Sequence, residues 1–169
     1  ITHYYEINEG IGVHKQPSQY GAFPTDPYSH TPAGKGAKQP GMTGQVKEDI
    51  LCRFGELGVL VNKGRIYFNP VLIRLYEFLG KPAVFEYFDV TSSRRQTDLG
   101  TGTLAFTYCQ VPIVYQLSDK NSVKIILGNQ REIIPEGMSL DEKWSESVFN
   151  RSGEIVRIEV QVRSEDIVR

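Results

Sequence analysis

The segment 21–32, GAFPTDPYSHTP, brings together the residue types that are best suited to chemistry in this sequence. Asp26 and His30 are four positions apart, and a carboxylate so placed can orient an imidazole for proton transfer. A simpler interpretation is that Asp26 caps a turn before Pro27 and that His30 is an ordinary loop histidine. We favour this simpler interpretation over catalysis by the segment.

Four aromatic residues are candidates for contact with a ligand. Tyr20, Phe23 and Tyr28 lie in or beside the same segment and offer flat apolar faces on which sugar rings can stack. Trp144, the single tryptophan, is a second candidate platform. A lone tryptophan in a β domain is more often partly buried in packing, so we expect Trp144 to be a core residue first.

The sequence contains no self-sufficient catalytic or metal-binding constellation. A glycosidase places two carboxylates about 5 to 9.5 Å apart across the bond that it cleaves. Glu6, Glu9 and Asp26 are the carboxylates of the aromatic-rich N-terminal zone, and nothing around them marks a catalyst, so the catalytic residues stay unknown. The three histidines are irregularly spaced and no cysteine accompanies them, so we predict no metal and no cofactor.

The charge and composition of the chain exclude several classes of partner. The 169 residues carry a formal net charge of −1, which gives no electrostatic footprint for nucleic acid or an anionic membrane. No stretch approaches the roughly twenty apolar residues of a spanning helix, so we expect a soluble protein. Cys52 and Cys109 are expected to be buried, reduced thiols. Because the sequence starts abruptly at Ile1, we interpret it as part of a longer protein, periplasmic or secreted if that protein carries a signal.

Two compositional zones meet near residue 41. Residues 8–41 are rich in glycine and proline, which predicts a long loop. Residues 43–57 have the period of an amphipathic helix, with Thr43 as its N-cap and Gly58 as the left-handed residue after its end. The apolar stripe of this helix, which we expect to be covered, consists of Val46, Ile50, Leu51, Phe54 and Leu57.

From residue 59 onward the pattern is typical of β-strands. Hairpins are predicted at 59–68 and 122–134, single strands at 83–90, 103–117 and 154–162, and a solvated connection at 91–100. Strict alternation in the last strand predicts an inward row of Val156, Ile158, Val160 and Val162. The predicted fold is mainly β: an antiparallel β-sandwich over 59–169, preceded over 1–58 by the long Gly/Pro-rich loop and one amphipathic helix.

The segments 21–32 and 39–51, the latter QPGMTGQVKEDIL, resemble the C-terminal region of large uncharacterised bacterial proteins that look like six-hairpin glycosidases and glycoside phosphorylases. In those proteins the last helix of an α-helical barrel is followed by a β-sandwich cap, and GRIYFNP at 64–70 is similar to the start of that cap. The resemblance therefore implies an upstream helical barrel as a partner and sugar contact near residues 21–45. The substrate-binding candidates that follow from it are Tyr20, Phe23, Asp26, Tyr28, His30 and Gln45.

Three functions follow as hypotheses. The first is an accessory C-terminal domain of a carbohydrate-active protein, not catalytic alone, because no catalytic acid of those enzymes matches a residue of this chain. The second is an independent carbohydrate-binding module that uses Trp144 or the tyrosines. The third is a non-enzymatic interaction domain.

Overall fold

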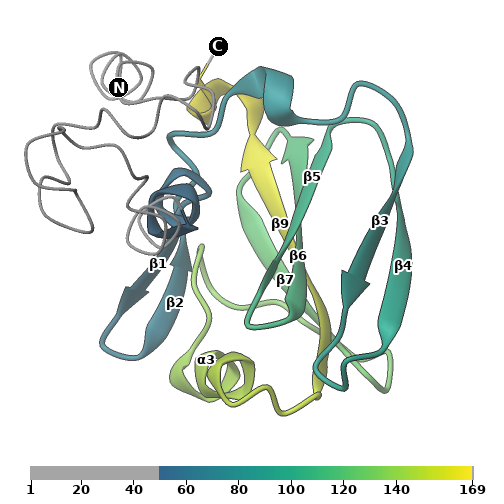
Figure 1. Cartoon of the computed structure of the whole chain (residues 1–169). Helices are drawn as coiled ribbons and strands as arrows, with labels where there is room; N and C mark the ends of the chain where they lie inside the picture. Colours follow the sequence, from purple (N-terminus) through teal and green to yellow (C-terminus); the bar gives the residue numbers. More distant parts are fainter. Residues whose placement is uncertain (1–49, 169) are drawn as a thin grey trace, which may run out of the picture. The chain divides into compact units, whose positions relative to one another are not determined.

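The computed structural model describes residues 50–168 and is mainly β, as the sequence predicts (Figure 1). The unit formed by residues 54–169 contains all the strands described below. Two 3₁₀ helices, Leu75–Glu77 and Ser164–Asp166, connect or end these strands.

Residues 50–56 form the end of the predicted helix. Gly58 follows it with φ +70°, and its N–H donates to the carbonyl of Gly55 at 3.0 Å, which confirms the predicted stop. Leu57 is buried, and the ring of Phe54 meets that of Tyr108 edge to face at a centroid distance of 5.1 Å. The covered stripe is thus confirmed at its C-terminal end, whereas Ile50 and Leu51 are exposed and the remaining positions lie outside the described residues.

A five-stranded sheet forms the centre of the domain, with the strand order β5-β6-β9-β7-β8. Three of its ladders are antiparallel, and β6 runs parallel to β9, a pairing that the antiparallel prediction did not include. This parallel pair is possible because β7, β8 and a helix form the long crossover between the two strands. The strands are β5 (Thr103–Tyr108), β6 (Val111–Ser118), β7 (Ser122–Leu127), β8 (Glu132–Ile133) and β9 (Ile155–Arg163).

One face of this sheet is covered by the hairpin of β1 (Val59–Asn62) and β2 (Arg65–Phe68) and by the helix α3 (Glu142–Phe149), which lie on the same side in Figure 1. The sequence prediction missed α3. Its N-cap Asp141 accepts a hydrogen bond from the backbone N–H of Trp144 at 2.9 Å. The buried hydroxyl of Ser145 accepts from the N–H of Ile66 at 3.0 Å and so ties α3 to β2.

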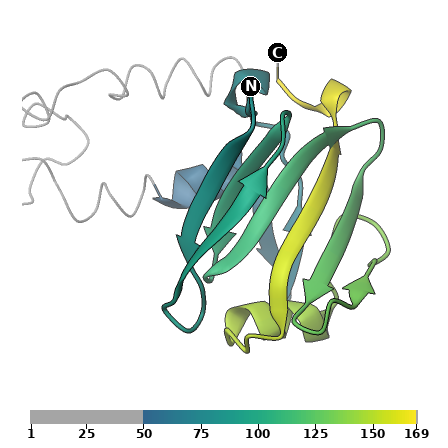
Figure 2. The same ribbon diagram turned by 90° about the vertical axis from the view of Figure 1, so that its right-hand side faces the viewer.

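The other face of the sheet carries a two-stranded ribbon of β3 (Ala83–Phe88) and β4 (Arg94–Leu99), seen from its outer side in Figure 2. The predicted solvated connection at 91–100 was therefore wrong for most of its length. The residues of β4 are polar because most of them are exposed on this outer ribbon, so the hydrophobic signal of a strand is absent.

The predicted strand 103–117 is in fact a hairpin, because Cys109 and Gln110 form a tight turn between β5 and β6. Their φ angles are +50° and +64°, a left-handed conformation that glycine and asparagine usually supply. Neither residue gives a turn signal in the sequence. The predicted burial of both cysteines was also wrong, because Cys109 lies in this turn and is half-buried and Cys52 is exposed.

The last strand departs from strict alternation at Val156. Ile158, Val160 and Val162 are buried as predicted, whereas Val156 is 43% exposed and Ile155 is buried in its place. The register explains the difference: Ile126 pairs with Arg157 and Leu127 with Ile155, so Val156 is the extra residue of a β-bulge.

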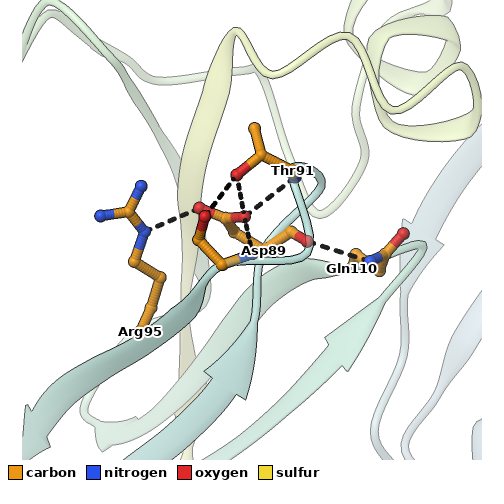
Figure 3. A network of polar contacts seen from close by, with 5 residues as sticks. Asp89, Thr91, Arg95 and Gln110 are labelled. Carbon is orange, nitrogen blue, oxygen red and sulfur yellow. Dashed lines mark hydrogen bonds and ion pairs between the residues drawn. The ribbon is translucent and has the colours of Figure 1, made fainter.

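The Asp89 carboxylate anchors the tip of the β3-β4 ribbon (Figure 3). It accepts hydrogen bonds from the N–H and hydroxyl of Thr91, the N–H of Ser93 and the Nε of Arg95. The side chain of Gln110 donates to the backbone carbonyl of Asp89 at 2.9 Å, which links this tip to the β5-β6 turn. These partners satisfy the carboxylate internally, so we regard the cluster as structural.

Asp89→Asn is expected to loosen the β3-β4 ribbon without unfolding the domain. The bonds from Thr91 and Arg95 hold the Asp89 pKa far below its usual value, so the carboxylate stabilises the ribbon above the unfolded pKa of about 4 and this contribution is lost as pH falls below it. At neutral pH, amide hydrogen exchange in β4 should therefore be faster in the variant than in wild type. Acidification should reduce the protection of β4 in wild type and leave that of the variant unchanged. Asp98→Asn, on the same ribbon, is the control, and equal acceleration by both variants would contradict the prediction.

Candidate functional site

All six substrate-binding candidates taken from the sequence lie outside the described residues. The structure neither gathers nor separates them, and they remain predictions. They are Tyr20, Phe23, Asp26, Tyr28, His30 and Gln45.

Trp144 lies within α3 and is only 7% exposed. The Nζ of Lys143 lies 4.4 Å from the centroid of the indole ring, in cation–π contact with one face. The ring belongs to the hydrophobic core, as expected for a lone tryptophan in a β domain. An exposed sugar platform at Trp144 is therefore excluded by its burial.

The described residues form a cavity of about 750 Å³ beside the β1-β2 hairpin, which we call the hairpin groove. Its lining comes from the hairpin, the segment 69–71, the segment 136–139 and the loops that flank the C-terminal end of β9. The apolar lining consists of Leu60, Tyr67, Phe68, Pro70, Val71, Met138 and Val162. The polar lining consists of Asn62, Asn69, Asn121, Glu136, Gly137, Ser139 and Asp166.

Strand pairing positions the tyrosine of this groove. Tyr67 pairs with Leu60 of β1 on one side and forms a β-bridge with Ser139 on the other, so its backbone is held on both edges. Phe68 and Val162, which also belong to the lining, are almost fully buried. The guanidinium of Arg65 lies 5.7 Å from the Tyr67 ring centroid and contacts one face of it.

A polar network fixes the end of the groove near the C-terminus of β9. The carboxylate of Asp166 accepts from the Nε and the second guanidinium nitrogen of Arg163 at 3.0 and 3.1 Å, and from the side-chain amide of Asn121 at 2.8 Å. The amide oxygen of Asn121 in turn accepts from the backbone N–H of Arg163 at 2.8 Å. The bond from Arg163, followed by that from Asn121, lowers the pKa of Asp166, so this carboxylate stays ionised.

The chemistry of the lining suits binding better than catalysis. Two carboxylates, Glu136 and Asp166, line the groove, but Asp166 is committed to its ion pair and a general acid needs the opposite shift in pKa. The lining contains no lysine, arginine or histidine. Within residues 50–168, no three histidine, cysteine or acidic side chains group in a way that could hold a metal ion.

Sequence reasoning did not find the hairpin groove. Asn62 and Asn69 stand next to a glycine turn and a proline, where asparagine is most simply explained by turn formation. Asn121 and Asp166 are 45 positions apart and meet only through the pairing of β7 with β9. The one local signal was the segment GRIYFNP, which contains Tyr67 and Asn69.

Comparison with known proteins adds no assignment: no family model matches the sequence, and no curated protein is significantly similar to it. Of the helices in the described part of the chain, none combines the length and the apolar character needed to cross a membrane.

Proposed function

We propose that the chain is a non-catalytic accessory domain of a carbohydrate-active protein. The observation that carries this proposal is the ion pair of Asp166 with Arg163, which holds the pKa of this groove carboxylate below its usual value and so makes it unsuited to act as a general acid. Burial of Trp144 speaks against the alternative of an independent module built on that ring.

The junction between the helix and the β domain supports an accessory role. The hydroxyl of Tyr115, at the centre of the sheet, donates to the backbone carbonyl of Leu57 at 2.6 Å and thus satisfies one of the free carbonyls at the helix end. The backbone N–H of Asn69 also donates to the carbonyl of Gly58 at 2.8 Å. A β domain so closely tied to the end of a helix is suited to supporting a helical element that precedes it.

The chain alone is expected to show no glycosidase or phosphorylase turnover on a panel of oligosaccharides. Glycoside hydrolysis needs two free carboxylates, whether its mechanism is retaining or inverting, and the groove lacks such a pair because Asp166 is held in its ion pair. Release of reducing sugar, with and without added inorganic phosphate, is the measurement. Robust turnover that is lost in Asp26→Ala would overturn the proposal and would make the segment 21–32 an active site.

In the longer protein that we propose, Asp26→Ala and His30→Ala are expected to lower activity or substrate affinity more than Trp144→Phe does. The segment 21–32 offers hydrogen-bonding groups beside aromatic rings, whereas the Trp144 ring is buried and its conservative replacement changes packing alone. The measurement is kcat and KM for the three variants. A larger loss in Trp144→Phe, with folding intact, would favour the module hypothesis.

A further inference from the structure

We propose that the hairpin groove binds a short, neutral oligosaccharide, with one pyranose ring stacked on Tyr67 and its hydroxyl groups bonded to Asn62 and Asn69. The assignment of the ligand class rests on the proposed function. The site itself rests on the lining of the groove. Its lining residues are different from the sugar-contact candidates predicted in residues 20–45.

The volume of the groove sets the size of the ligand. About 750 Å³ lies in the range of cavities that hold a drug-sized molecule, which is enough for a short oligosaccharide. The cavity is partly open to solvent, so a chain of sugars can enter it from outside.

Tyr67 supplies the apolar surface that one face of a pyranose ring needs. Its backbone is fixed by pairing with Leu60 and Ser139, and Arg65 holds the ring from one face. An aromatic ring already held in place loses little side-chain entropy when a sugar stacks on it, which favours binding.

The asparagine side chains supply hydrogen bonds of the right kind. Asn62 and Asn69 line the groove, and no described residue makes a hydrogen bond with either side-chain amide. Each amide offers donors and an acceptor together, which matches a sugar hydroxyl, itself both donor and acceptor. Asn121 and Asp166, by contrast, are already bonded to each other and to Arg163, so they act as a fixed wall.

The charge of the lining disfavours an anionic ligand. Glu136 and Asp166 are the charged residues of the groove, and both are acidic. Arg163 already neutralises Asp166, so Glu136 is the carboxylate that would repel a uronic acid or a phosphate. Neutral hexose units avoid this repulsion.

The test is a titration of the full chain, followed by amide chemical shifts, with four probes: cellotetraose, maltotetraose, a glucosamine tetramer and a galacturonate trimer. At least one neutral probe should bind and shift the amides of the hairpin and of segment 136–139, and the galacturonate trimer should bind at least tenfold more weakly. Tyr67→Ala should weaken binding at least tenfold and Tyr67→Phe little, because stacking needs the ring. Asn69→Ala should weaken it about fivefold through one lost hydrogen bond.

Tyr76→Ala is the matched control, since Tyr76 is an exposed tyrosine outside the groove. Folding of each variant is checked by its thermal unfolding, and Asn69→Ala tests the site even if Tyr67→Ala proves unstable. Binding that survives the groove variants and is lost in Tyr28→Ala would overturn the groove site and leave the proposed function standing. No binding of any probe, or tighter binding of a charged one, would also overturn it, whereas turnover by the chain would contradict the accessory role alone.

Discussion

Gly58→Ala is expected to lower the free energy of unfolding by about 2 to 5 kcal/mol, the largest effect of a single methyl group in this domain. Gly58 has φ +70°, a left-handed conformation that costs a residue with a side chain about 1 to 2 kcal/mol. An added Cβ would also lie 2.2 Å from the backbone C and O of Asn69. Those backbone atoms cannot rotate away, so the contact between the helix end and the segment after β2 must open, at a further cost of about 1 to 3 kcal/mol.

Gly64→Ala separates these two causes. Gly64 has φ +75°, close to that of Gly58, but an added Cβ would meet no atom within 4 Å. Only the backbone cost of about 1 to 2 kcal/mol should remain. Urea denaturation of both variants provides the measurement, and equal losses of stability would show that the close approach of Gly58 to Asn69 is unimportant.

The elements that sequence predicted well are those whose signals are local. The β1-β2 hairpin has Gly64 in its turn, and the helix ends at Gly58, where a left-handed residue is needed. The buried positions Ile158, Val160 and Val162 follow from alternation in a strand with one face in the core. In each case the local preference and the final packing agree.

The elements that sequence missed depend on tertiary structure. The turn at Cys109 and Gln110 has no glycine, and its geometry is imposed by the pairing of β5 with β6. Strand β4 carries polar residues because it lies on an outer ribbon, and its pairing with β3 decides its conformation. The bulge at Val156 arises from the register of β9 against β7, which no periodicity reports.

The binding site that we propose in the hairpin groove could not be predicted from the sequence either, because it too depends on tertiary structure. Tyr67 and Asn69 are near in sequence, but Asn121 and Asp166, which also line the groove, come from the loop before β7 and the segment after β9. A binding surface assembled from four separate segments has no linear motif. The residues 20–45, in contrast, were found because glycine, proline and aromatic residues concentrate in one stretch.

The second large effect is expected at Tyr115, whose side chain is fully buried between Phe68 and Phe106. Tyr115→Ala should cost about 3 to 5 kcal/mol, since a cavity of aromatic size would open at the centre of the sheet. Tyr115→Phe keeps the ring and removes only the hydroxyl. It should cost about 1 to 3 kcal/mol, because the carbonyl of Leu57 is left without this buried donor.

The pH dependence of stability distinguishes the contribution of the Tyr115 hydroxyl from that of its ring. Burial raises the pKa of this phenol well above its ordinary value, so its contribution is fully present below the unfolded pKa of about 10 and is lost as pH rises further. Wild type should therefore lose stability in alkali more steeply than Tyr115→Phe, which has no proton to release at this position. Tyr76→Phe, at a tyrosine that is 76% exposed, should retain the wild-type alkaline slope. Denaturation curves at several pH values between about 8 and 11 test this, and parallel slopes for wild type and Tyr115→Phe would mean that the hydroxyl at the helix end contributes no alkaline sensitivity.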